Sequence, residues 1–256
     1  MSDAMGIYAL WYREIKVFFR EKSRIVSSVV NPILWLLVIG GGIGSAFSLG
    51  KLNYQSFIFP GVLMQVAIFS SVFFGVYIVW DKKIDFLKEV LISPISRTSI
   101  FFGKVLGGST DSLIQTTLLL IIGVIFVHIG ILQGINFTAT TLLLSFFIII
   151  LSSFGLVSMG LLIGSQMESP EGFQMIGSFL IFPMFFLSGA LFPIDNLPSW
   201  LAPFTFLNPM TYPVDALRGV LLGASHFNVF FDIGVIGTFS VVMILIGSYA
   251  FKNMKV

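Results

Sequence analysis

The chain alternates long apolar stretches with short polar segments. Each apolar stretch is about twenty residues long, the length of helix that crosses the roughly 30 Å hydrocarbon core of a bilayer. Asn31-Pro32 suits the start of the first stretch, because Asn caps helices and Pro fits a first turn. The pattern predicts an all-α integral membrane protein, with residues 1–256 forming a single transmembrane domain. The six predicted spans cover about residues 29–49, 57–79, 105–127, 142–164, 173–192 and 233–251.

Ahead of the first span, large apolar residues recur at three-and-four spacing, which places them on one face of a helix. They are Tyr8, Trp11, Tyr12, Ile15, Phe18 and Phe19, and the basic residues Arg13, Lys16 and Arg20 fall on the other side. The pattern predicts an amphipathic helix within residues 1–28 that lies in the plane of the membrane surface, with its aromatic rings in the headgroup layer. This helix either only anchors the terminus or also contacts a partner subunit through its charged face.

The fifth span leads into a stretch, residues 182–219, that contains six of the ten prolines. Each proline removes a backbone donor and clashes with the preceding turn, so we expect Pro183 to interrupt the span and residues 193–227 to form a broken, re-entrant helical region. Non-helical backbone survives at membrane depth only beside protein or a water-filled cavity, which makes this region the candidate gate. The candidate gate residues are Ser188, Gly189, Phe192, Pro193, Pro198, Asn208, Pro209, Tyr212 and Arg218.

A charged segment, DKKIDFLKEVLISPISR at residues 81–97, separates the second and third predicted spans. Ile84, Leu87 and Leu91 form one stripe, which predicts a short amphipathic helix. Ser93-Pro94 ends it, because a residue before proline is disfavoured in the helical conformation. The residues alone describe a helix in a solvated loop.

Small and charged residues within the spans suggest helix packing or a transport path. Gly40 and Gly44 form a small-xxx-small pair that predicts close packing against a helix of this subunit or of another. Asp111 follows Lys104 by seven residues in the third span. A carboxylate at the centre of a membrane helix costs on the order of 3 kcal/mol. Asp111 therefore either stays near the interface or makes a polar contact in the pathway.

Composition excludes several classes of protein. Hydrophobic residues make up 56% of the chain and charged residues 10%, whereas ordinary soluble domains carry about 25% charged residues. There is no cysteine, and a net charge of +2 does not indicate nucleic-acid binding. No nucleophile, base and orienter occur together, and no Gly-Lys-Ser/Thr phosphate loop is present. We therefore expect no enzyme activity, no metal site and no cofactor bound by this chain.

The basic residues predict the orientation. Twelve of the fourteen Lys and Arg residues lie in the N-terminal segment, in residues 82–104 and in the C-terminal tail, and the other two are Lys51 and Arg218. Basic residues accumulate in cytoplasmic segments. We expect a multi-pass protein of the plasma membrane with both termini in the cytoplasm and the candidate gate facing outward.

Two C-terminal blocks resemble a known family. FLSGALFPIDNLPSWL at residues 186–201 and FLNPMTYPVDALRG at 206–219, together with LISPISR at 91–97, are similar to ABC-2 type transport permeases. These are the membrane subunits of ABC exporters of the drug-resistance or polysaccharide-export type. The resemblance extends over nearly the whole chain.

The resemblance implies partners that the residues alone do not define. Residues 81–97 would be the coupling element that docks onto a separate ATPase subunit, and that subunit would use the ATP and Mg²⁺. The complex would contain two ATPase copies and a second permease subunit, as a homodimer, surrounded by membrane lipid. The candidate coupling residues are Asp85, Lys88, Glu89, Ser93, Pro94 and Arg97.

Three functions remain open at this level. The first is ATP-driven export of a hydrophobic compound, a drug or a lipid-like molecule, because the chain is rich in phenylalanine. The second is export of a lipid-linked polysaccharide by the same architecture. The third, from another class, is an ion-coupled secondary transporter, which would need ionisable residues along its path.

Overall fold

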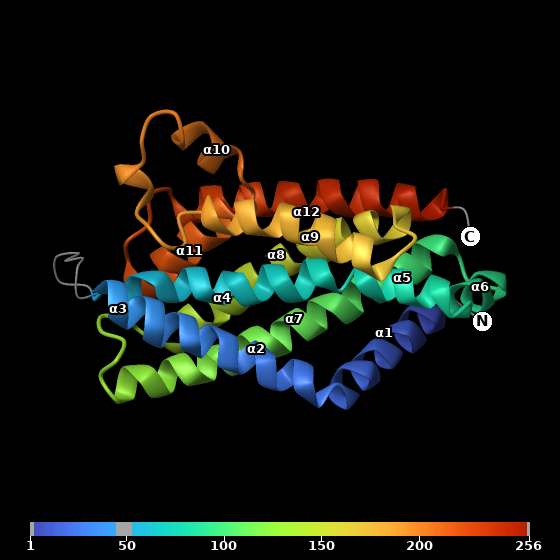
Figure 1. Ribbon diagram of the computed structural model, residues 1–256, viewed down its shortest axis with the longest axis horizontal. Helices are drawn as coiled ribbons and strands as arrows, with labels where there is room; N and C mark the ends of the chain where they lie inside the picture. Colours follow the sequence, from blue (N-terminus) through green and yellow to red (C-terminus); the bar gives the residue numbers. More distant parts are fainter. Residues whose placement is uncertain (1–2, 45–52, 255–256) are drawn as a thin grey trace.

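The computed structural model describes residues 3–44 and 53–254, and every regular element in these ranges is helical. The helices form an elongated bundle (Figure 1). The first six are α1 (Asp3–Arg20), α2 (Lys22–Leu34), α3 (Gly40–Gly44), α4 (Tyr54–Phe73), α5 (Val76–Lys83) and α6 (Phe86–Ile92). The others are α7 (Arg97–His128), α8 (Ala139–Gln166), α9 (Pro170–Phe186), α10 (Ala202–Leu207), α11 (Thr211–Leu222) and α12 (Val229–Lys252).

The bundle has two ends with different contents. The start of α1, helix α6 and the end of α12 lie together at one end, which we call the α6 end (Figure 1). Helices α3, α10 and α11 lie at the opposite end, which we call the α11 end (Figure 1). The predicted coupling segment and the predicted gate are therefore separated by the length of the molecule.

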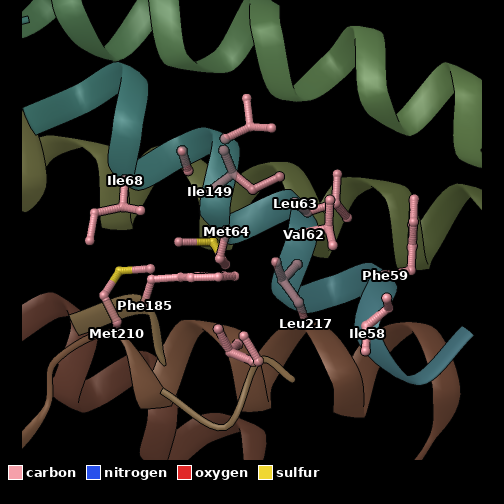
Figure 2. Packing of buried hydrophobic residues seen from close by; sticks show 14 of the residues in the cluster. Ile58, Phe59, Val62, Leu63, Met64, Ile68, Ile149, Phe185, Met210 and Leu217 are labelled. Carbon is pink, nitrogen blue, oxygen red and sulfur yellow. The ribbon is translucent and has the colours of Figure 1, made fainter. Parts of the chain in front are cut away.

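Helix α4 is the centre of the fold. It is apolar around its whole circumference and almost every one of its residues is buried, as expected of a helix surrounded by other helices. Figure 2 shows Ile58, Val62 and Met64 of α4 among residues of the helices around it. Ile149 of α8 and Leu217 of α11 belong to the same cluster, so the core continues into the predicted gate region.

Five described helices or helix pairs are long and apolar enough to span a membrane. They cover Lys22–Gly42, Tyr54–Lys83, Arg97–His128, Ala139–Gln166 and Val229–Lys252. Helix α9, in the place of the predicted fifth span, has 17 residues, or about 26 Å at 1.5 Å per residue. It is thus shorter than the hydrocarbon core, and the count of six spans stays a prediction.

Pro183 does not interrupt α9, contrary to the sequence prediction. The helix continues through it to Phe186. Pro183 lies in the last turn, so the missing N–H leaves only the carbonyl of Phe179 without its helical partner, and three more residues complete the helix. The predicted end of the span at residue 192 is also wrong, since the chain turns at Gly189, which has a φ of +73°.

The N-terminal boundary differs from the prediction as well. Helix α1, predicted to be interfacial, ends at Arg20, and residue 28 belongs to the next helix, α2, which begins at Lys22. Asn31 and Pro32 lie inside α2 and do not open it. Pro32 cannot donate to the carbonyl of Ser28, and the ladder loosens into a π-helical turn, Trp35–Ile39, directly afterwards. The predicted end of this span, residues 45–49, lies outside the described residues.

The predicted coupling helix over residues 81–97 is divided between two elements. Asp81 belongs to α5, and α6 is a separate helix of seven residues. Asp85 separates them with a φ of 59°, a left-handed conformation that ends one helix before the next begins. The third span also begins earlier than predicted, because Ser96 caps α7 by accepting a hydrogen bond from the Ser99 N–H.

Close helix contacts depend on glycine at several points. A Cβ on Gly40 would lie 2.7 Å from Gln55 Cγ, and one on Gly44 would lie 3.4 Å from Tyr54 Cβ. Both glycines therefore face α4 of the same chain. At Gly75, between α4 and α5, a Cβ would collide with the carbonyl oxygen of Gly160 in α8, so only glycine permits this approach.

Candidate functional site

Four charged side chains from three helices meet next to the α6 end. Lys104 of α7 is only 1% exposed and its Nζ lies 2.8 Å from Glu14 Oε1 of α1. The same ammonium group pairs with Asp81 of α5. Arg13 of α1 completes the group, with Nη2 2.9 Å from Asp81 Oδ1 and Nη1 2.8 Å from Glu14 Oε1. We call these four residues the charge cluster.

Small residues on α7 bring the cluster together. Gly103 and Gly107 lie one turn apart, and a Cβ on either would overlap side-chain atoms of Leu10 or Glu14 on α1. This spacing lets α1 lie directly against α7, as in close-packed membrane helices. Glu14 is consequently buried on the side of α1 that packs against α7.

The cluster is electrically balanced. Two carboxylates face two cations, which compensates for the large cost of removing each charge from water. Burial alone would lower the pKa of Arg13, but Asp81 and Glu14 outweigh burial and raise it. The Arg13 guanidinium also lies 4.0 Å from the ring centre of Phe86, the first residue of α6. The cluster thus connects α1, α5 and α7 and touches α6.

Asp111 takes part in a second polar group, about two turns beyond Lys104 along α7. Arg24 of α2 pairs with its carboxylate, and Gln115 donates to Asp111 Oδ1 at 2.6 Å. Arg24 also donates to the Tyr77 hydroxyl at 2.7 Å, and Tyr77 donates to Glu21 at 2.6 Å. The charge of Asp111 is neutralised by a partner from the first span, so this residue connects α2, α5 and α7.

A pocket of about 630 Å³ opens beside this second group. Arg24, Asn31 and Gln115 supply polar groups to its wall, and Trp35, Phe69 and Phe182 supply aromatic ones. These residues come from α2, α4, α7, α9 and the π-helical turn. Asp111 itself is absent from the wall and reaches the pocket only through Arg24 and Gln115. The lining suits a molecule with both apolar and polar parts.

The coupling residues occupy the tip of the α6 end. Lys88 and Asp85 form a surface ion pair at 2.8 Å, and Glu89 and Pro94 are exposed. Ser93 donates to the Val90 carbonyl at 2.5 Å and ends α6. Arg97 points elsewhere, because its Nη1 donates at 2.9 Å to the carbonyls of Lys252 and Met254 at the end of α12. The tip also exposes Ile92, which is 86% accessible.

Part of the candidate gate is a buried anchor on α11. Arg218 is buried; its Nη2 donates to the Gly189 carbonyl at 2.7 Å, and its guanidinium lies 4.1 Å from the Phe57 ring centre. Asn208 donates to the Met184 carbonyl at 2.6 Å and accepts from the Met210 N–H at 3.0 Å. The end of α9 and the start of α11 are therefore fastened together and to α4.

The remaining gate residues lie in the same region, with Ser188 fully buried. The Ser188 hydroxyl donates to the Phe185 carbonyl at 2.6 Å, and the Tyr212 hydroxyl to the Phe206 carbonyl at 2.6 Å. Phe192, Pro193 and Pro209 are half-buried, whereas Pro198 is exposed in the loop before α10. The structure thus brings Ser188, Gly189, Asn208 and Arg218 together and leaves Pro198 apart from them.

The sequence reasoning missed the charge cluster. It placed Arg13 on a solvated face, Asp81 in a solvated loop and Lys104 before the third span, and it made no use of Glu14. A signal was nonetheless present, since an acidic residue between Arg13 and Ile15 stands beside large apolar residues of the amphipathic helix. Charged residues embedded in membrane helices usually pair with one another. Which residues pair cannot be read from positions 68 or 90 residues apart.

Within residues 3–44 and 53–254, no three His, Asp or Glu side chains are grouped as a metal site. The all-helical fold with five described helices or helix pairs long and apolar enough to cross a bilayer defines a polytopic membrane protein. Residues 5–222 match the family described as ABC-2 type transporter. The chain belongs to this ABC-2 type transporter family.

Relatives with printed names agree with this assignment. A putative transport permease, ycf38, of Cyanophora paradoxa is 29% identical over 258 residues, covering 93% of this chain and 86% of the relative. The inner membrane transport permease YadH of Escherichia coli strain K12 is 26% identical, with 96% and 91% covered. Nodulation protein J of Rhizobium leguminosarum bv. viciae is 23% identical, with 96% and 94% covered. The chain is a transport permease, and permeases of this family work with an ATPase subunit.

Proposed function

We propose that this chain is the membrane subunit of an ATP-driven exporter that moves a hydrophobic compound, a drug or lipid-like molecule, out of the cytoplasm or the inner leaflet. Hydrolysis of ATP with Mg²⁺ takes place on the separate ATPase subunit. The observation that carries the proposal is the charge cluster, because it joins α1, α5 and α7 and touches α6 through the contact of Arg13 with Phe86. A force applied at α6 reaches α1, α5 and α7 through this cluster.

Helix α6 is the docking element. Glu89, Lys88 and the exposed Ile92 face away from the bundle and are free to contact another subunit. Ser93 and Pro94 define the end of the element, and Asp85 defines its turn from α5. Arg97 contributes indirectly, because it ties the start of α7 to the end of α12. Two permease copies, as a homodimer, with two ATPase copies would supply the two-fold arrangement.

The pocket beside Asp111 is the place where a substrate enters the path. Its aromatic residues suit a hydrophobic compound, and its Asn, Gln and Ser groups suit a polar head. Trp35 and Tyr77 also line it, so stacking against the sugars of a lipid-linked polysaccharide is the alternative substrate chemistry. The α10–α11 region at the far end then opens for release. In this scheme both termini and α6 are cytoplasmic, and the protein lies in the plasma membrane.

An ion-coupled secondary transporter is less well supported. It needs an ionisable residue that changes its protonation or ion occupancy along the path. Asp111 is paired with Arg24 and hydrogen-bonded by Gln115, and it does not line the pocket. Its contacts are those of a structural ion pair.

Co-purification with the ATPase subunit tests the proposal. Glu89→Arg and Ile92→Glu are expected to reduce recovery of the ATPase at least tenfold, because they place a charge change and a buried carboxylate in the docking surface. Ile129→Glu is the matched control, since Ile129 is also exposed but follows α7 at the α11 end. Unchanged ATPase recovery with both α6 variants, or equal loss with the control, would contradict docking through α6.

A further inference from the structure

A second pocket, of about 920 Å³, lies at the α11 end, away from Asp111. Met159 of α8 and Met184 of α9 form its deep wall and are only 8% and 9% exposed. Tyr212 of α11 and the α12 residues Gly234 and Thr238 form its other sides. Phe206 and Leu207 of α10 also line the pocket, which is therefore bounded by five helices and has two nearly buried methionines in its wall.

The wall offers no free polar group to a ligand among these residues. The Tyr212 hydroxyl donates to the Phe206 carbonyl at 2.6 Å, and the Thr238 hydroxyl donates to the Gly234 carbonyl at 2.8 Å. The rest of the wall is mainly Leu, Met, Phe and Val, with three methionines that adapt to irregular shapes. The kind of ligand that matches this apolar, adaptable wall is a flexible hydrocarbon chain.

The length of the pocket fits one leaflet. Along α12 it extends from Phe231 to Met243, twelve steps of the helix or about 18 Å at 1.5 Å per residue. Half of a hydrocarbon core of about 30 Å is about 15 Å. The pocket starts close to the first residue of α12 and so coincides in depth with the leaflet at the α11 end.

The pocket is continuous with the surface of the protein that faces lipid. Phe231, Gly234 and Thr238 lie on the same face of α12 as Leu245 and Tyr249, at helical spacing, and all five are exposed. This helix is one of the candidate spans, and its face has no covering element in the described residues. Bilayer lipid is the surrounding medium at this depth, so it has direct access to the pocket.

We propose that this pocket binds one acyl chain of a bilayer phospholipid from the leaflet at the α11 end. The chain lies along α12 with its end against Met159 and Met184. It fills the space between α9, α11 and α12, so the re-entrant helices of the gate rest on lipid as well as on protein. This inference rests on the membrane location of the family and is independent of which compound is exported.

Photolabelling in lipid nanodiscs tests the site. The probe is a phosphatidylcholine with a diazirine in one acyl chain, and the labelled residues are mapped by mass spectrometry. We expect labelling of Met159 and Met184, which are only 8% and 9% exposed, in addition to labelling of the exposed Leu245. Absence of label at both methionines in the unmodified protein would overturn the proposal without any variant.

A filling variant supplies the second measurement. Gly234 lines the pocket and a Cβ built on it meets no atom within 4 Å, so Gly234→Phe introduces a ring at the pocket wall without a clash at Cβ. We expect it to lower labelling of Met159 and Met184 at least fivefold and to leave Leu245 unchanged. Val241→Phe adds the same ring to the exposed face of α12 outside the pocket wall. We expect it to leave labelling of the two methionines and of Leu245 unchanged. Equal labelling in both variants would contradict an acyl chain in the pocket.

A second copy of the chain is the competing occupant. The protein has no cysteine, so Phe231→Cys introduces a single thiol at the rim of the pocket. If lipid fills the pocket, oxidation leaves this variant without a disulfide-linked dimer. Efficient dimer formation together with unlabelled methionines would assign the face to another subunit and overturn the lipid site.

Discussion

At the scale of single residues, the charge cluster shows how a membrane protein keeps ions inside its helices. Lys104 has two carboxylate partners, Glu14 and Asp81, and each of these carboxylates also forms an ion pair with Arg13. Pairing of this kind contributes little net stability compared with apolar packing, but removal of one partner leaves a buried charge alone. The arrangement of α1, α5 and α7 that pairs all four charges is therefore lower in free energy than arrangements that leave one of them unpaired.

We expect Lys104→Met to destabilise the protein by about 3–5 kcal/mol, because Asp81 and Glu14 would stay buried and share a single cation, Arg13. The measurement is the free energy of unfolding in detergent micelles. Lys88→Met is the matched control: it breaks the exposed pair with Asp85 and should cost about 0–1 kcal/mol. A similar decrease in the free energy of unfolding for both variants would show that burial of the charge cluster has no energetic consequence.

At the scale of elements, the boundaries follow from contacts between helices. The break between α4 and α5 falls at Gly75, where α8 approaches so closely that its Gly160 carbonyl occupies the place of a side chain. This contact fixes the direction of α5, and α5 in turn carries Asp81 to the cluster. The position of α6 thus depends on a glycine contact more than ten residues earlier.

We expect Gly75→Ala to force α5 and α8 apart and to destabilise the protein by about 1–3 kcal/mol, the usual cost of overpacking. Thermal unfolding of the purified protein is the measurement. Gly234→Ala serves as the control, because a Cβ there meets nothing within 4 Å and replacing glycine within a helix stabilises it by up to about 1 kcal/mol. A Gly75→Ala protein as stable as the control would contradict the close approach.

At the scale of the whole molecule, the two ends of the bundle differ in what they carry. The α6 end carries the proposed docking surface and the charge cluster, and the α11 end carries the buried anchor of Arg218 and the apolar pocket. Helices α7, α8 and α12, and α4 followed by α5, run between the two ends (Figure 1). The core consists of one apolar cluster around α4 and a second at the α6 end, and α7, α8 and α12 contribute to both, so motion at one end can reach the other through them.

We expect the two ends to lie on opposite sides of the membrane. The absence of native cysteine permits single-cysteine variants, Lys88→Cys at the α6 end and Trp200→Cys before α10, both at exposed positions. A membrane-impermeant maleimide added to intact cells should label only Trp200→Cys, and Lys88→Cys should react only after the membrane is opened. Labelling of both variants in intact cells would refute the proposed orientation.

The sequence by itself determined the features that depend on local composition. Hydrophobic runs located the long helices, because only such runs are stable in a bilayer, and the proline density located the irregular region before α12. The stripe of apolar residues near the N-terminus predicted α1, although Phe18 packs inside and Tyr8 stays exposed. The two C-terminal blocks indicated the family before any contact was known.

Only the tertiary structure decided which charges and which small residues meet. Glu14, Asp81 and Lys104 come from three helices, and their pairing results from the packing of α1 and α5 against α7. The break between α4 and α5 at Gly75 likewise depends on the neighbouring α8 and not on local preference. The physical reason is that hydrophobicity acts on each segment separately, whereas pairing of buried charges and close backbone contact need two segments at once.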